Sequence, residues 1–159
     1  MTKATTAKLG LSVVAVAGIG FVMYSSVVNG QRFENVDDLT AGDLAQWDGR
    51  DMRVGGWVVP NSIVEKVIDQ QTHRTFVMHG FAGRKMRVFN VGPKPDTFMN
   101  ESQVVSSGRI VPANTLVAEA GRLGVTVGRD EYVIDASDLS AKCPSKYDNV
   151  KPSQVPIKY

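Results

Sequence analysis

The sequence predicts an all-β fold, a small antiparallel barrel that follows one N-terminal transmembrane helix. Residues 9–28 form a run of 20 uncharged, mostly apolar residues, which predicts the helix. The rest of the chain contains five or six short segments rich in β-branched and aromatic residues. Turn residues separate these segments closely, and the crossover helices of a parallel sheet are missing, so a small antiparallel barrel is expected.

The apolar run is interpreted as a signal anchor. Twenty helical residues span about 30 Å, the thickness of the hydrocarbon core of a bilayer. Lys3 and Lys8 precede the run, whereas acidic residues follow it, and the positive-inside rule therefore predicts a cytoplasmic tail at 1–8. The run is longer than the apolar region of a signal peptide, and no Ala-x-Ala site follows it. We expect a single-pass protein of the bacterial inner membrane, with its C-terminal domain in the periplasm.

Residues 29–48 are expected to form a linker with a short helix in DDLTAGDLAQW, capped by Thr40 or Asp37. The barrel is expected to occupy residues 49–142. Its first strand, DMRVGGWVV, begins at Asp51 and is predicted to bulge or bend at Gly55 and Gly56. After a turn at Pro60 and Asn61, SIVEKVID is predicted as the return strand.

The later strands follow in order along the chain. HRTFVMH and RKMRVFN are predicted to form a hairpin through Gly80–Gly83, and SQVVSSGRIV and EYVIDAS are the last clear strands. Between these two, residues 113–125 form either a helix or a hairpin insertion. Five strands with a long, bent first strand are typical of an OB barrel.

Charge and composition exclude several classes of protein. Residues 9–159 carry equal numbers of basic and acidic side chains, whereas a nucleic-acid-binding domain shows a basic excess, so no nucleic-acid partner is expected. We interpret a local basic patch as solvated surface; it contains Arg84, Lys85, Arg87 and Lys94. No catalytic arrangement of side chains can be identified, and we expect the protein not to be an enzyme.

Two histidines fall in one predicted strand. His73 and His79 share a face of that strand but lie about 20 Å apart at 3.3 Å per residue. One metal ion cannot bridge this distance, so we interpret them as a surface pair.

The strongest candidate for function is Cys143, the only cysteine, in the sequence CPSKY at 143–147. A single thiol excludes an intramolecular disulfide, a multi-cysteine zinc site and two-cysteine haem attachment. Lys142 and Lys146 favour its thiolate form. An idle exposed thiol is an odd choice in an oxidising compartment. A thiol can add to a haem vinyl group, the phenolate of Tyr147 can ligate ferric iron, and the two lysines are candidates to pair with haem propionates.

The chain resembles the CcmE family, the periplasmic OB-fold haem chaperones of cytochrome c maturation. The resemblance rests on the anchor, on MRVGGWVVPNSI at 52–63, on PDTF at 95–98 and on DLSAKCPSKY at 138–147. Most members have histidine where Cys143 stands, and the chain looks like the less common cysteine form. The resemblance implies covalent haem at Cys143 and Tyr147 as the axial ligand of the haem iron.

Two functions remain open, and both have integral membrane proteins as partners. The first is a carrier that takes haem from a membrane-bound haem-handling complex and passes it to apocytochrome c. The alternative is a non-catalytic, single-span subunit of a larger membrane assembly, built on the same fold. The segment 115–131 is longer than the hairpin that the family normally has there, and residues 143–159 are expected to form the haem-motif segment and an extended tail.

Overall fold

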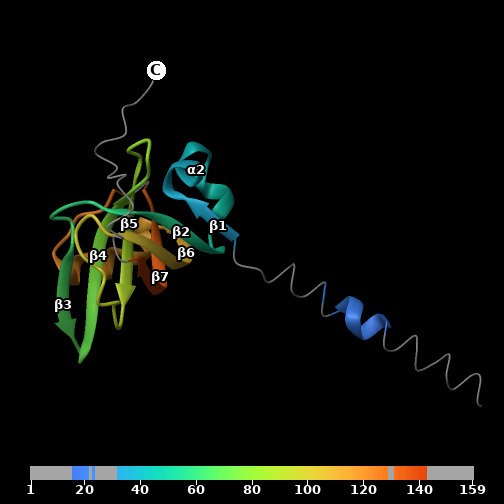
Figure 1. The fold of residues 1–159 in the computed structure, drawn as a ribbon. Helices are drawn as coiled ribbons and strands as arrows, with labels where there is room; N and C mark the ends of the chain where they lie inside the picture. Colours follow the sequence, from blue (N-terminus) through green and yellow to red (C-terminus); the bar gives the residue numbers. More distant parts are fainter. Residues whose placement is uncertain (1–15, 22, 24–31, 129–130, 143–159) are drawn as a thin grey trace, which may run out of the picture. The chain divides into compact units, whose positions relative to one another are not determined.

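The computed structural model describes residues 16–21, 23, 32–128 and 131–142 of the chain (Figure 1). The chain divides into two units, Met1–Gln31 and Arg32–Tyr159. In the first unit, residues 16–21 and 23 are helical, and the apolar side chains among them that are described are exposed. None of the helices in the described residues is long and apolar enough to span a bilayer. Most of the anchor predicted at 9–28 lies outside the described residues.

The second unit begins with a short strand and two helical turns, and strands make up most of the rest. In chain order its elements are β1 (Arg32–Asn35), α2 (Val36–Ala41), a 3-10 turn (Leu44–Trp47), β2 (Asp51–Val58), β3 (Val64–Ile68), β4 (Gln71–His79), β5 (Lys85–Val91), β6 (Gln103–Pro112), a 3-10 turn (Ala113–Leu116), α3 (Val117–Leu123) and β7 (Tyr132–Lys142).

All seven strands in the described residues lie in one sheet, in the order β1-β2-β6-β7-β5-β4-β3, and an additional pairing joins β2 to β4. This pairing closes β2, β6, β7, β5 and β4 into a ring. The pairs β1–β2 and β5–β7 are parallel, and all other pairs are antiparallel. A closed five-stranded barrel of this kind is OB-like, and the predicted all-β barrel is confirmed.

The first strand of the barrel is long and bent, but its bend lies after the two glycines. Both β2 and β3 run antiparallel to β4, so they are two parts of one strand that continues in the same direction. Residues 59–63 interrupt it. The Ser62 hydroxyl donates to the Val59 carbonyl at 2.7 Å and accepts the Val77 N–H at 3.1 Å, which satisfies backbone groups at the break. The prediction that SIVEKVID returns beside the first strand is therefore wrong.

The predicted bulge at Gly55 and Gly56 is also wrong. The ladder between β2 and β6 continues through both residues without a shift of register, and a shift occurs instead between β6 and β7, at Ser107 and Gly108. The two glycines provide space for close packing. A Cβ on Gly55 would lie 2.8 Å from the Phe33 ring, and one on Gly56 would lie 2.9 Å from the His79 carbonyl oxygen.

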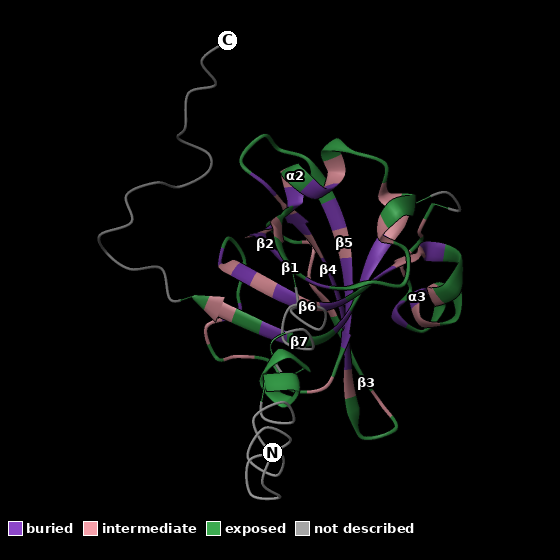
Figure 2. Cartoon of the chain, turned by 90° about the vertical axis from the view of Figure 1, so that its right-hand side faces the viewer, coloured by how far each residue is buried: buried purple, intermediate pink, exposed green. Residues whose placement is uncertain are grey.

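The main core fills the inside of the barrel (Figure 2). Every barrel strand contributes buried apolar side chains, α2 adds Val36 and Leu39, and Phe98 enters from the loop between β5 and β6. The helix α2 has Asn35 as its N-cap residue, without a capping side-chain hydrogen bond. The expected caps, Thr40 and Asp37, lie inside the helix.

The open alternative at 113–125 resolves as a 3-10 turn followed by the helix α3. A second, smaller core forms where residues of this segment pack on Phe89 of β5 and Val133 of β7. The same helix covers His73, whose Nδ1 lies 2.5 Å from Oε1 of Glu119. His73 is therefore buried, and its interpretation as a surface residue is wrong because α3, 46 residues away, covers it.

Candidate functional site

The strand β7 ends at Lys142, which lies opposite Gln103, the first residue of β6. Lys142 is exposed. The other predicted site residues, Cys143, Lys146 and Tyr147, lie outside the described residues. The described part of the site is therefore the surface around Lys142, one residue before the thiol.

Five residues, Lys142 among them, form a continuous row across the five barrel strands. Successive register pairs join them: Lys85 with His79, His79 with Trp57, Trp57 with Gln103, and Gln103 with Lys142. Directly paired residues of antiparallel strands share a face of the sheet. We call these five residues the rim row, because each lies at or next to an end of its strand.

The rim row faces out of the barrel. The neighbouring positions Met86, Met78, Val58 and Val104 belong to the interior core, and alternation along each strand puts the row residues on the opposite side. The row residues are partly or fully exposed. With adjacent strands about 4.8 Å apart, Trp57 and Lys142 are separated by roughly 10 Å.

The middle of the rim row is aromatic. Phe81, in the β4–β5 hairpin, packs edge to face on Trp57 with ring centroids 4.3 Å apart, and 56% of it is exposed. The imidazole of His79 lies 6.1 Å from the Trp57 ring. Its Nδ1 lies 2.9 Å from the Gly80 carbonyl oxygen, which makes Nδ1 the N–H donor of that bond. Trp57 and Phe81, which we call the aromatic pair, present an apolar surface to solvent.

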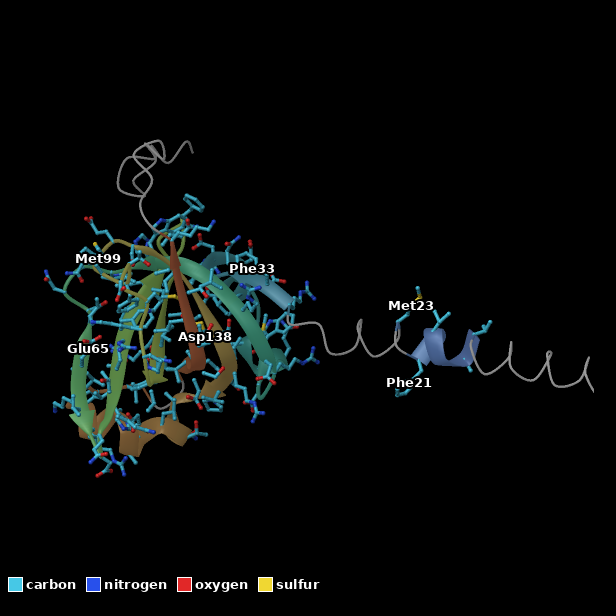
Figure 3. All side chains as sticks on the ribbon, turned by 60° about the horizontal axis from the view of Figure 1, so that its bottom comes forward. Phe21, Met23, Phe33, Glu65, Met99 and Asp138 are labelled. Carbon is cyan, nitrogen blue, oxygen red and sulfur yellow. The ribbon has the colours of Figure 1, made fainter. Side chains whose placement is uncertain are left out.

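The loop between β5 and β6 holds the end of β7 in place. The Thr97 hydroxyl donates to the Ala141 carbonyl at 3.1 Å, while Phe98 packs edge to face on Phe76 inside the barrel at 4.8 Å. The same loop carries Met99, which is 51% exposed near the barrel end shown at the top of Figure 3. The PDTF sequence therefore connects the core to the backbone two residues before Cys143.

A buried cation fixes the start of this loop. The Arg74 guanidinium, 2% exposed, donates to Glu65 and to Asn90, both at 2.6 Å, and Nη2 lies 3.4 Å from the Gly92 carbonyl oxygen. Lys94 of the loop also donates to Glu65, at 3.0 Å. Burial alone would raise the pKa of Glu65, but hydrogen bonds from Arg74 and Lys94 outweigh it and hold that pKa below its ordinary value.

Sequence reasoning identified Lys142 but missed Trp57 and Phe81. A signal was present, because HGFAGR places an aromatic residue between two glycines of a hairpin, where polar residues are usual. In the described residues, no three His, Cys, Asp or Glu side chains lie together as they would around a metal ion.

Among solved structures, the chain is similar to the solution structure of an OB domain from Thermoplasma acidophilum, with 10% identity and a TM-score of 0.42; the match covers 81% of this chain and 95% of that one. It is also similar to a crystal structure of a putative aspartyl-tRNA synthetase from Leishmania major Friedlin, with 7% identity and a TM-score of 0.42, covering 71% of this chain and 21% of that one.

No curated protein matches the chain significantly. The model of the CcmE domain, in contrast, matches residues 31–150. This range includes the whole barrel, the rim row and the sequence CPSKY. The chain therefore belongs to the CcmE family.

Proposed function

We propose that the protein is a membrane-anchored haem chaperone of cytochrome c maturation, which carries haem as its cargo on Cys143. One observation carries the proposal. Lys142 lies in the rim row, two strands from Trp57. Cys143, the only cysteine of the chain, is the next residue in the sequence after Lys142, and the row contains Trp57 of the exposed aromatic pair. A porphyrin is flat and apolar on both faces, and Trp57 with Phe81 offers it a stacking surface.

The proposed attachment needs no reagent beyond haem and the thiol. The Cys143 sulfur forms a bond to one carbon of a haem vinyl group, and the proton goes to the other carbon as the double bond becomes single. Lys142 and Lys146 favour the thiolate that makes this bond. The Tyr147 phenolate is the proposed axial ligand of ferric iron. With Cys143 as the attachment residue, the proposed type of the chain is the cysteine form of the family, with the pattern C-x-x-x-Y.

The proposed location is the bacterial inner membrane, with residues 9–28 as the anchor and the barrel in the periplasm. The charge asymmetry around the run supports it. We expect a reporter that is active only after export to be active when fused after Tyr159. Activity of a reporter that works only in the cytoplasm, fused at the same place, would contradict this orientation.

The proposed partners are a membrane-bound complex that supplies haem and the apocytochrome c that receives it. The rival function, an accessory subunit of a larger membrane assembly, would use the extra segment 115–131 for docking. The position of α3 leaves the rim row available under either function, because α3 packs on Phe89 and Val133, near the start of β7.

Covalent haem tests the proposal directly. The full chain is expressed together with its own maturation partners, purified from membranes and denatured, and its absorbance spectrum is recorded. We expect a haem spectrum that stays with the denatured chain, because a thioether bond survives unfolding whereas ligation does not. A denatured chain without haem would refute the carrier function and leave the accessory subunit.

A further inference from the structure

We propose that Lys85 and Arg87 of β5 bind the propionate carboxylates of the haem. The inference rests on the proposed carrier function and adds to it the orientation of the cargo. It concerns the basic patch that sequence analysis interpreted as solvated surface.

Both residues lie on the outer face of the barrel, at the end of the rim row away from Lys142. Lys85 is paired with His79 and Arg87 with Val77, so their side chains share a face with the aromatic pair. Lys85 is exposed and Arg87 is half-buried. Within the described part of the chain, neither side chain has a hydrogen-bond or ion-pair partner, although the Arg84 side chain beside them donates to the Thr40 carbonyl at 2.6 Å.

The chemistry of haem decides which cations can reach its carboxylates. Haem carries its two vinyl groups and its two propionates on opposite edges of the macrocycle. A haem attached through a vinyl group to Cys143 has its vinyl edge next to Lys142. If its face lies on Trp57, its propionate edge points along the row, past His79, towards Lys85. Lys142 and Lys146 flank Cys143 in the sequence; their expected pairing with the propionates is the alternative, under which Lys85 and Arg87 are not needed.

The charges near this end of the row agree with the assignment. Asp37, an acidic residue that contacts the hairpin, accepts a hydrogen bond from the Ala82 N–H at Oδ2, at 2.8 Å, and its carboxylate lies against Gly80. It therefore faces the hairpin backbone. Two unpaired cations on one outward face can form charge-assisted hydrogen bonds to carboxylates, and Arg87 has the fork geometry for a bidentate pair.

The test compares ferric haem with its dimethyl ester, in which both propionates are neutral. The purified full chain is titrated with each probe, and the dissociation constants are obtained from the Soret band. We expect wild type to bind haem at least 10-fold more tightly than the ester, because each charge-assisted bond lost costs about that factor or more. In the double variant K85A/R87A we expect haem binding to weaken to the level of the ester, and ester binding to stay unchanged.

A matched control removes the same charge elsewhere. The double variant R53A/R109A changes two exposed cations on the outer faces of β2 and β6, of which Arg109 pairs with Asp51 at 3.3 Å, and it is expected to keep the preference for haem. The inference is overturned if K85A/R87A keeps the wild-type preference, if it loses both probes equally, or if R53A/R109A abolishes the preference as well. A wild-type chain that binds neither probe overturns the carrier function with it, whereas wild-type binding that ignores Lys85 and Arg87 overturns this inference alone.

Discussion

Replacement of Cys143 by alanine is expected to remove all covalent haem from the protein. The chain has no other thiol, so no second residue can form a thioether with a vinyl group. The measurement is the absorbance spectrum of the denatured full chain after expression with its maturation partners. Haem that remains attached to the denatured Cys143→Ala variant would contradict the proposed attachment site.

Tyr147→Phe is the matched comparison, because it removes only the phenolic oxygen. We expect this variant to keep covalent haem while the spectrum of the ferric iron changes, since the thioether and the axial ligand are different bonds. If the spectra of the variant and of wild type are identical, Tyr147 is not the ligand. If Tyr147→Phe also loses attachment, the two residues do not have the separate roles proposed for them.

The largest loss of stability is expected for Gly108→Ala. A Cβ on Gly108 would lie 2.1 Å from the Asp135 carbonyl oxygen and 2.6 Å from the Cα of Ala136. Both are backbone atoms of β7 at the register shift, so no side-chain rotation relieves the clash. We expect the free energy of unfolding to fall by about 3 kcal/mol or more, measured by chemical denaturation and followed by circular dichroism.

Gly121→Ala provides the control for this substitution. Gly121 is in α3, and an added Cβ there meets no atom within 4 Å. Because alanine is the better helix former, this change is expected to raise stability by about 0.5–1 kcal/mol. Equal effects of the two substitutions would mean that β6 and β7 are not packed closely at Gly108.

The sequence by itself determined the class of fold and the positions of most barrel strands along the chain. Alternating β-branched residues and closely spaced turns predicted β4, β5, β6 and β7, because side-chain period and turn chemistry are local properties. The sequence also pointed to Cys143 and Tyr147, because a thiol and a phenol four residues apart can attach haem and ligate its iron. These residues and the anchor at 9–28 stay predictions, since they lie wholly or mostly outside the described residues.

Tertiary structure alone decided the register, the burial of polar groups and the composition of the rim row. The first strand is interrupted at residues 59–63, after β2 has already begun to pair with β4 at Trp57 and Val58, and glycine content does not encode that position. His73 is buried because α3 folds over it. The rim row joins residues from five strands. Their proximity depends on closure of the barrel, a set of long-range contacts that no local pattern specifies.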